Sequence, residues 1–180
     1  SVDSERSAET LLAVIPNQAN LYTAAFTLAA WVKPSRVNTN DERFTIFSSQ
    51  FSDGTLFPQG PFRLEIEEGK PKVTWTGHGA DNPQTLRAFD GTERTLPTDS
   101  YTHLMVVFGL ELEDYEMRLY VDGELRALAG QTDPLSSRNM DLEPRDGIGA
   151  HFNSNGATPR AFFPFNGAID DLRIWNKAHS

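Results

Sequence analysis

Two carboxylates in the run Glu65-Ile-Glu67 have a spacing that could serve acid–base chemistry. Alternate residues of a β-strand share one face, and a rise of about 3.3–3.4 Å per residue would place these side chains about 7 Å apart. That separation is closest to the range of inverting glycosidases, in which one carboxylic acid protonates the leaving group and the other activates water. The alternative is a solvated strand face that leads into a turn at Glu68-Gly69. The pair alone leaves both interpretations open.

A second group of oxygen-bearing side chains lies in the segment Asn38-Thr-Asn-Asp-Glu42. Calcium takes six to eight oxygen ligands from carboxylates, amides, backbone carbonyls and water. Asn38, Asn40 and Asp41 are therefore candidate calcium ligands. The segment lacks the full spacing of an EF-hand loop, so an ordinary polar loop is the alternative.

A third kind of chemistry, sugar binding, requires an aromatic ring for the apolar face of a pyranose and polar groups for its hydroxyls. Three segments combine these residue types: residues 51–61, 75–82 and 151–163. We expect a ligand site on the rim formed by residues 77–82 and 153–160. The candidate ligand-binding residues are Trp75, His78, Asp81, Asn82, Asn153, Asn155 and Arg160. Trp75 shares its strand face with Val73, so packing in the core is the alternative for that residue.

The composition excludes several other functions. The chain of 180 residues has a formal charge of −9, which argues against binding to nucleic acid or anionic lipid because their phosphates would be repelled. Zero cysteines exclude disulfides and thiol catalysis. No Gly-x-Ser-x-Gly motif supports a serine hydrolase, and no apolar run approaches the roughly 18 residues that would indicate insertion in a membrane.

The elements that would position these residues are short strands, because apolar residues recur with period 2 and not with the helical period of 3.6. Asp122-Gly123 and Glu68-Gly69 each predict a two-residue hairpin turn. In the last strand, Ile169 is out of phase with Leu172 and Ile174, which predicts a bulge at Asp170-Asp171. The predicted strands are residues 10–15, 26–33, 44–51, 62–67, 70–76, 101–109, 115–121, 124–129, 148–152 and 168–175.

Five segments, in order along the chain, resemble the laminin-G-like and pentraxin-like jelly rolls of the concanavalin A-like lectin/glucanase superfamily. The resemblance implies an all-β, two-sheet antiparallel β-sandwich, with residues 1–180 as one domain excised from a larger protein. Tyr101 stands where the family usually has Trp, and the family's opening strand is poorly matched. The segments are Phe26-Thr-Leu-Ala-Ala-Trp-Val-Lys-Pro34, Tyr101-Thr-His-Leu-Met-Val-Val-Phe108, Met117-Arg-Leu-Tyr-Val-Asp-Gly-Glu-Leu125, Ile148-Gly149 and Phe165-Asn-Gly-Ala-Ile-Asp-Asp-Leu-Arg-Ile-Trp175.

The resemblance also bears on the candidate chemistry. Domains of this superfamily often hold a structural calcium through the aspartate of the last-strand motif, which corresponds to Asp170, with Asp3 as a further candidate ligand and Asp171 as a weaker one. Laminarinase-type glycosidases of the fold use a Glu-x-Asp-x-Glu run, but here Gly69 occupies the position of the second catalytic acid. Trp31, Tyr120 and Trp175 are expected to pack in the fold. We therefore expect a protein that is not an enzyme.

The predicted function is a non-catalytic carbohydrate-binding or adhesion module, stabilised by calcium, in a secreted or cell-surface protein. Its expected partner is a glycan or polysaccharide, or else a surface protein. The lack of disulfides favours a bacterial source over an animal one. A protein-binding or structural spacer module is the main alternative, and a divergent glycosidase or polysaccharide lyase is the third.

Overall fold

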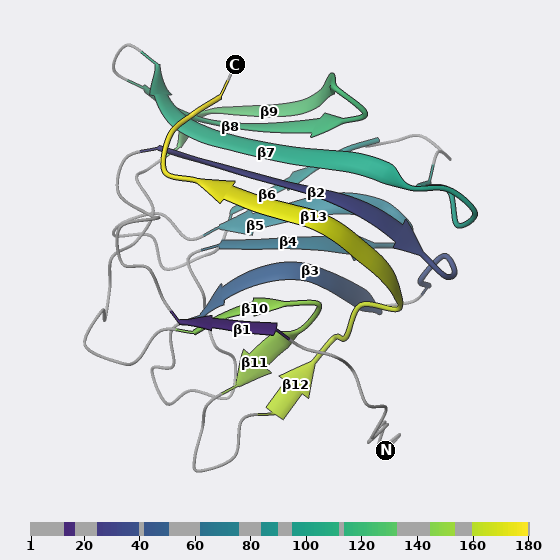
Figure 1. The fold of residues 1–180 in the computed structure, drawn as a ribbon. Coiled ribbons are helices and arrows are strands. Elements are labelled where there is room, and N and C mark those ends of the chain that lie inside the picture. Colours follow the sequence, from purple (N-terminus) through teal and green to yellow (C-terminus); the bar gives the residue numbers. More distant parts are fainter. Residues whose placement is uncertain are drawn as a thin grey trace.

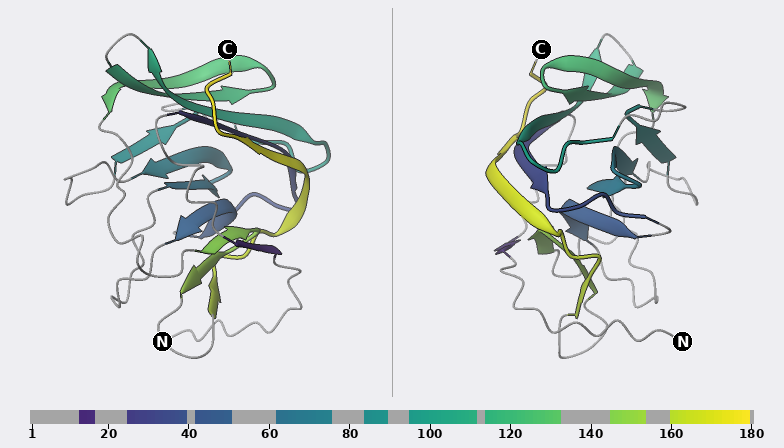
Figure 2. Two further views of the ribbon diagram at one scale, coloured as in Figure 1. Left: turned by 60° about the vertical axis from the view of Figure 1, so that its left-hand side comes forward. Right: turned by 90° about the vertical axis from the view of Figure 1, so that its right-hand side faces the viewer.

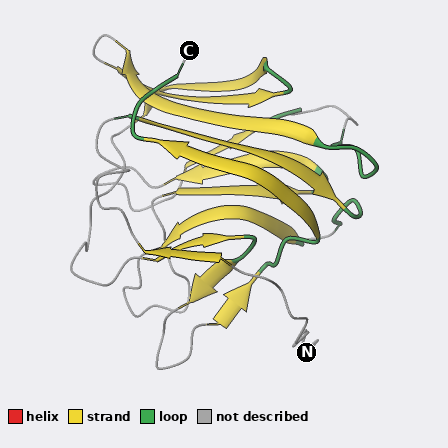
Figure 3. Ribbon diagram, in the orientation of Figure 1, coloured by secondary structure: helices red, strands yellow, loops and turns green. Residues whose placement is uncertain are grey.

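The computed structural model describes residues 13–16, 25–39, 42–50, 62–75, 84–89, 95–111, 114–132, 145–153 and 160–179. Among these residues all regular secondary structure is β-strand (Figure 3). None of them forms a helix long and apolar enough to span a bilayer. The strands are β1 (Ala13–Pro16), β2 (Phe26–Pro34), β3 (Arg43–Gln50), β4 (Phe62–Glu67), β5 (Lys70–Trp75), β6 (Gln84–Arg87), β7 (Thr102–Glu111), β8 (Asp114–Val121), β9 (Glu124–Thr132), β10 (Arg145–Ile148), β11 (His151–Asn153), β12 (Arg160–Phe162) and β13 (Gly167–Trp175).

The strands form two packed sheets and a small two-stranded unit. The six-stranded sheet has the order β1-β10-β3-β4-β5-β6, the five-stranded sheet has the order β13-β2-β7-β8-β9, and β11 pairs with β12 (Figures 1 and 2). Every strand pair is antiparallel. The prediction of an all-β, two-sheet antiparallel sandwich is confirmed.

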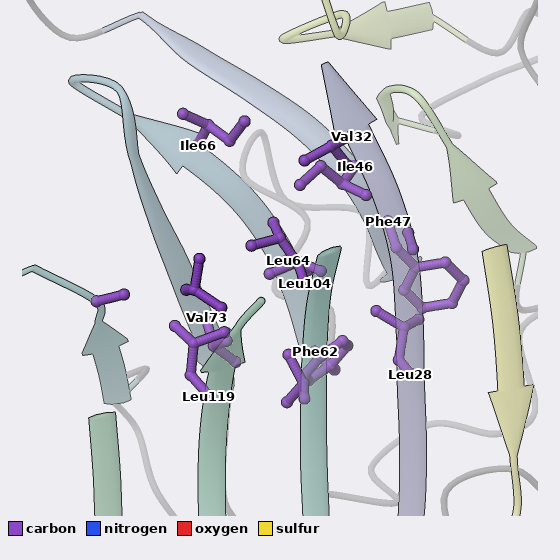
Figure 4. Close-up of a cluster of buried hydrophobic side chains, with 14 of the residues drawn as sticks. Leu28, Val32, Ile46, Phe47, Phe62, Leu64, Ile66, Val73, Leu104 and Leu119 are labelled. Atoms are coloured by element: carbon purple, nitrogen blue, oxygen red, sulfur yellow. The ribbon is translucent and has the colours of Figure 1, made fainter. Parts of the chain in front are cut away.

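Apolar side chains from the inner faces of both sheets fill the space between them (Figure 4). Alternation with period 2 places Phe62, Leu64 and Ile66 of β4 in this core, and fully burying each such side chain contributes about 1.5–3 kcal/mol. The core also holds Phe26, Leu28, Ala30, Val32, Phe44, Ile46, Phe47, Val73, Trp75, Leu104, Val106, Phe108, Met117, Leu119 and Val121.

Both predicted hairpin turns are confirmed by their backbone geometry. Glu68 and Gly69 have φ values of 54° and 73°, and Asp122 and Gly123 have values of 52° and 79°. Two consecutive residues with positive φ are the signature of a type I′ turn, whose twist matches that of the flanking strands. These turns set Glu67 opposite Lys70 in the first hairpin.

The predicted bulge in β13 is also present. Its register against β2 shifts between Asp170 and Arg173, and Asp171 has a φ of 47°. An extra residue reverses the alternation of inward and outward side chains. Ile169, Leu172 and Ile174 consequently all pack against the core.

A second bulge, which the sequence pattern did not predict, lies in β3. The register against β4 shifts between Thr45 and Phe47, so Ile46 is the extra residue. Phe44, Ile46 and Phe47 are all buried in the core as a result. Thr45 lies opposite Glu65 of β4.

The predicted strand list was wrong in three places. The expected strand at residues 148–152 is divided into β10 and β11 by Gly149, which has a φ of 79°. Strands β6 and β12 were missed. Gln84-Thr-Leu-Arg87 lacks an alternating apolar pattern, and it becomes a strand because the edge of β5 pairs with it.

The last residues of the chain pack on the outer face of the five-stranded sheet. The Thr27 hydroxyl of β2 donates a hydrogen bond to Lys177 O (2.8 Å) and accepts one from His179 N (2.9 Å). A Cβ atom at Gly109 of β7 would lie only 2.8 Å from the Ala178 Cβ. Residues 177–179 therefore close the end of this face where β2 and β7 lie side by side.

Candidate functional site

The outer face of the six-stranded sheet, turned away from the core, carries three rows of polar side chains. We call these rows the polar face. Their chain neighbours, such as Leu64 and Val73, point into the core, so alternation directs the polar residues outward. In cross-strand register the rows are Arg43–Glu67–Lys70, Thr45–Glu65–Lys72–Arg87 and Ser48–Arg63–Thr74–Thr85.

The centre of the polar face is buried although it faces away from the core. Glu65 is only 1% exposed and Lys72 only 6%, and Thr45 and Thr74 are buried as well. Arg43 and Arg87 are more accessible. Burying charged groups is costly unless they are paired, so such an arrangement needs a reason beyond solubility.

Glu67 is the hub of an ion-pair network in this region. Its carboxylate lies 3.1 Å from Lys72 Nζ and 3.5 Å from Arg43 Nε, and it also pairs with the Arg87 guanidinium. Among the described residues Glu65 pairs only with Lys72, whose Nζ lies 3.5 Å from its Oε1. Three cations of the face therefore pair with one of its two carboxylates, that of Glu67.

Three buried oxygens of the polar face lack a hydrogen-bond partner: Thr45 Oγ1, Glu65 Oε1 and Thr74 Oγ1. The 3.5 Å approach of Lys72 to Glu65 counts as an ion pair but not as a hydrogen bond. A buried polar atom without a partner costs about 1–3 kcal/mol. Three such atoms on adjacent strands leave the centre of the polar face with hydrogen-bonding capacity that the fold itself does not use.

Arg63 lies in the same part of the face, opposite Ser48 on one side and Thr74 on the other. Burial lowers the pKa of its guanidinium, an effect that Glu65 and Glu67 oppose and Arg43 reinforces. In total the three rows contain five cationic side chains and two carboxylates, a formal charge of +3 in a chain whose net charge is −9. The polar face is a local cationic region on an acidic protein.

An aromatic ring lies at the border of the polar face. Phe163 is 39% exposed, and the Arg43 guanidinium lies 5.5 Å from its ring centroid. The Phe163 carbonyl accepts a hydrogen bond from Thr45 N (3.1 Å). Its φ of 52° is unusual for a bulky residue, and such strained residues are often found at binding sites. Phe163 offers the apolar surface that sugar sites combine with polar groups.

The predicted pair Glu65 and Glu67 does share one strand face. In the structure, however, the Glu67 oxygens are already engaged by Lys72, Arg43 and Arg87. An acid–base pair needs carboxylates that can reach the substrate. This geometry is better suited to holding Glu67 in place than to catalysis by it.

The residues predicted to bind a ligand divide into three groups. Trp75 is 1% exposed and belongs to the core, so the alternative of core packing is correct and its ring offers no face to solvent. Asn153 and Arg160 are paired across β11 and β12. His78, Asp81, Asn82 and Asn155 lie outside the described residues. The two-stranded unit adjoins the polar face, because the Ser48 hydroxyl donates to Ala150 O (3.2 Å), just before β11.

The predicted metal ligand Asn38 has a structural role instead. Its buried amide donates to Glu42 O (2.7 Å) and Ile66 O (2.8 Å), and its Oδ1 accepts from Gly69 N (2.8 Å). Two of these bonds tie Asn38 to the β4–β5 hairpin, and the third ties it to Glu42. Because the amide is enclosed and already partnered, the interpretation of Asn38 as a calcium ligand is wrong. Asn40 and Asp41 lie outside the described residues.

Asp170 lies at the β13 bulge and is exposed, and its Oδ1 accepts a hydrogen bond from Asp171 N (2.8 Å). Asp171 in turn accepts one from Arg173 Nε (2.8 Å). Nowhere in the described part of the chain do three His, Cys, Asp or Glu side chains gather to hold a metal ion. Asp3 is not among the described residues. The calcium site thus stays a prediction that rests on Asp170.

The expectation that Trp31 packs in the fold was also inaccurate. Trp31 is 41% exposed on the outer face of the five-stranded sheet, where its ring lies 5.0 Å from that of His103. The backbone N of His103 donates to Asp122 Oδ1 (2.9 Å), which fixes this end of β7 to the β8–β9 turn.

The polar face itself was missed at the level of the sequence, apart from Glu65 and Glu67. A signal was present, since Arg63, Glu65 and Glu67 alternate with apolar residues and Lys72 and Thr74 do the same in β5. Only the register between the strands shows that these side chains form one surface.

Comparison with solved structures finds a similar sandwich in several other proteins. The chain is 16% identical to the heptameric SAP-like pentraxin from Limulus polyphemus, covering 88% of this chain and 66% of that one, with a TM-score of 0.59. It is 17% identical to the Ruminococcus gnavus IT-sialidase CBM40 bound to α2,3 sialyllactose (88% and 78% covered, TM-score 0.64). It is 14% identical to domains LG4-5 of the mouse laminin α1 chain (94% and 41% covered, TM-score 0.61).

Identities this low show a shared fold and nothing finer. The chain spans just under two thirds of the pentraxin chain and about two fifths of the laminin fragment. No curated protein matches it at a significant level of sequence similarity. A laminin-G family model, described as the concanavalin A-like lectin/glucanases superfamily, matches residues 8–180. The chain therefore belongs to this laminin-G family, and its sandwich is a jelly roll of the concanavalin A-like superfamily.

Proposed function

We propose that this protein is a non-catalytic carbohydrate-binding module of a secreted or cell-surface protein. The observation that carries the proposal is the set of three unpartnered buried oxygens on the polar face, Thr45 Oγ1, Glu65 Oε1 and Thr74 Oγ1. Sugar hydroxyls both donate and accept hydrogen bonds, so they complement a mixture of hydroxyls and a carboxylate. Phe163, at the border of the face, supplies an aromatic surface for the sugar ring.

The similarity to a carbohydrate-binding module solved with α2,3 sialyllactose supports the same assignment at the level of the fold. The earlier candidates His78, Asp81, Asn82, Asn153, Asn155 and Arg160 remain part of the proposal as a second rim of contacts. Of these, Asn153 and Arg160 belong to the two-stranded unit beside β3.

The absence of catalysis is part of the proposal. Gly69 stands where related glycosidases have an acid, and the Glu67 carboxylate is held by three cations. Incubation with a panel of polysaccharides should release no reducing ends. Turnover that disappears in Glu65→Gln would contradict this part of the proposal.

We expect binding to be detected on a glycan array and quantified by titration calorimetry, with and without calcium. Phe163→Ala should weaken the affinity about three- to tenfold, because aromatic contacts contribute about 0.5–1.5 kcal/mol. Leu128→Ala, on the outer face of the other sheet, is the matched control and should bind normally. If no glycan of a diverse array is bound, with or without calcium, the proposed function is refuted.

Calcium stabilisation is a second element of the proposal and rests on Asp170. The β13 bulge leaves Asp171 and Leu172 without paired residues on β2, so their backbone is outside the regular ladder beside the Asp170 carboxylate. Calcium at about 100 times its dissociation constant should add about 2.7 kcal/mol to the free energy of unfolding. Asp170→Ala should abolish this gain and Asp171→Ala should largely keep it. No gain in wild type, with no metal found by elemental analysis, would remove calcium from the proposal.

A protein-binding or spacer role is the alternative that one observation favours. Large apolar side chains are exposed on the outer face of the five-stranded sheet: Trp31, Leu125 and Leu128. Exposed apolar surface of this kind can mark a protein interface. If the glycan array is silent, and Trp31→Ser abolishes binding to a surface-protein ligand, this role replaces the carbohydrate one.

A further inference from the structure

Arg63 differs from the other cations at the centre of the polar face in having no described partner. Arg43, Lys72 and Arg87 all reach Glu67. Within the described residues the Arg63 guanidinium makes no hydrogen bond or ion pair, and the nearby Glu65 and Glu67 act on it only through their charge. A half-buried guanidinium offers five N–H donors, and no nitrogen of Arg63 is among the fully buried unpartnered atoms, so these donors are open to a ligand.

The surroundings of Arg63 provide the other contacts that a ligand would need. Thr74 lies opposite it across the β4–β5 pair, Glu65 is two residues along β4, and Thr45 is opposite Glu65. Cross-strand neighbours on one face have Cβ atoms about 4.5–5.5 Å apart, and residues i and i+2 are about 6.6–6.8 Å apart. The unpaired guanidinium and the three unpaired oxygens thus fall within the dimensions of one or two sugar rings.

We propose that the polar face binds its glycan through a carboxylate-bearing sugar, a uronic or sialic acid, whose carboxylate is held by the Arg63 guanidinium. This inference rests on the proposed carbohydrate-binding function and specifies its ligand class. The planar guanidinium matches a carboxylate with two parallel hydrogen bonds. Thr45, Thr74 and Glu65 then bind the sugar hydroxyls.

The charges of the polar face favour a ligand with one negative group over a polyanion. The formal charge of +3 attracts an anion, although the protein as a whole is acidic. Glu65 and Glu67, however, would repel the additional charges of a densely sulfated sugar. A single carboxylate surrounded by free hydroxyls fits both conditions.

The test compares glycans that differ only in the carboxylate. Methyl galacturonoside is paired with its methyl ester, and 3′-sialyllactose is paired with the methyl ester of its sialic acid, so the two arms separate uronic from sialic acid. By titration calorimetry, the acidic member of at least one pair should bind wild type tenfold or more tightly than its neutral counterpart. Arg63→Gln should lose about ten- to hundredfold in affinity for the acidic member, in line with hydrogen bonds to charged groups. Its affinity for the neutral member should change little.

Arg173→Gln is the matched control, because it removes the same charge from an exposed position on the other sheet. Equal affinity for acidic and neutral members, or an unchanged preference in Arg63→Gln, would overturn the carboxylate inference while leaving carbohydrate binding intact. Binding to no glycan at all would overturn both. If circular dichroism shows Arg63→Gln to be unfolded, Arg63→Lys becomes the test variant. Lysine keeps the positive charge but cannot make the two parallel hydrogen bonds of a guanidinium. Full affinity of Arg63→Lys would contradict the proposed geometry.

Discussion

The outer faces of the two sheets are built in opposite ways. On the six-stranded sheet, the polar face buries charged and hydroxyl groups and leaves three of their oxygens without partners. On the five-stranded sheet, apolar residues such as Trp31 and Leu128 are exposed, while the buried hydroxyl of Thr27 is fully used by the end of the chain. The hydrogen bonds of Thr27 stabilise the second face, whereas the unpartnered oxygens of the first cost stability. This difference supports the proposed use of the polar face for binding.

The largest effect is expected at the edge of the five-stranded sheet, where the backbone permits no side chain. Gly167 has a φ of 153°, and an added Cβ atom would lie 2.2 Å from Lys33 O and 2.8 Å from the Pro34 Cα. Gly167→Ala should lower the free energy of unfolding by about 4 kcal/mol, measured by urea denaturation. Gly130→Ala in β9 has nothing within 4 Å of the new methyl and should be nearly neutral. A similar loss in both variants would show that β-sheet glycines in general, and not this close contact, set the effect.

The next largest effect should be the removal of a buried cation from the polar face. Lys72→Met leaves Glu65 without its ion-pair partner and removes one of the three cations around Glu67. Breaking a buried pair from one side costs about 3 kcal/mol or more.

Lys33→Met provides the comparison on the opposite sheet, where Lys33 Nζ lies 5.4 Å from the Tyr101 ring centroid. Thermal and urea unfolding should show a loss within about 1 kcal/mol, since partly exposed cation–π contacts are weak. If the two lysine variants lose equal stability, the buried ion pairs of Lys72 contribute no more to folding than a partly exposed cation–π contact.

A smaller loss is expected when the hydroxyl that holds the C-terminal segment is replaced. Thr27→Val keeps the shape of the side chain but removes the bonds to Lys177 O and His179 N. Two hydrogen bonds of this kind contribute about 1–3 kcal/mol in total, so we expect a loss of about 1.5 kcal/mol. Thr27→Ser should recover most of it. Hydrogen exchange at residues 177–179 should speed up in Thr27→Val, and unchanged protection would contradict the assigned role.

The same substitution should have the opposite sign on the polar face. Thr74→Val replaces a buried hydroxyl that has no partner, so it should raise the free energy of unfolding by up to about 1 kcal/mol. It should also weaken binding of the glycan, which we propose uses this hydroxyl. A destabilised variant with unchanged glycan affinity would show that Thr74 serves the fold and not the ligand.

Much of the fold could be predicted from the sequence because its rules are local. Alternation identified most strands, the Glu68-Gly69 turn follows from the φ preferences of its residues, and the phase slip around Asp170 revealed the bulge. Strand β6 could not be predicted, because pairing with β5 rather than its own sequence makes it a strand.

The candidate site was harder to predict for the same physical reason. The polar face is assembled from four strands, and the sequence does not show which residues of β3 and β5 lie opposite Glu65. Residue type alone also misleads. Asn38 has a side-chain oxygen suited to calcium, but that oxygen binds the backbone of the β4–β5 hairpin. Trp75 is aromatic, but it packs in the core.

The bulges in β3 and β13 have a consequence for how this scaffold can change. Each fixes the alignment of its strand from within, because sliding by one residue would expel core side chains such as Ile46 or Leu172. Strand alignment is thereby made largely independent of the lengths of the connecting loops. Connecting loops could be exchanged while the strands keep their register, which makes this sandwich a practical starting point for design.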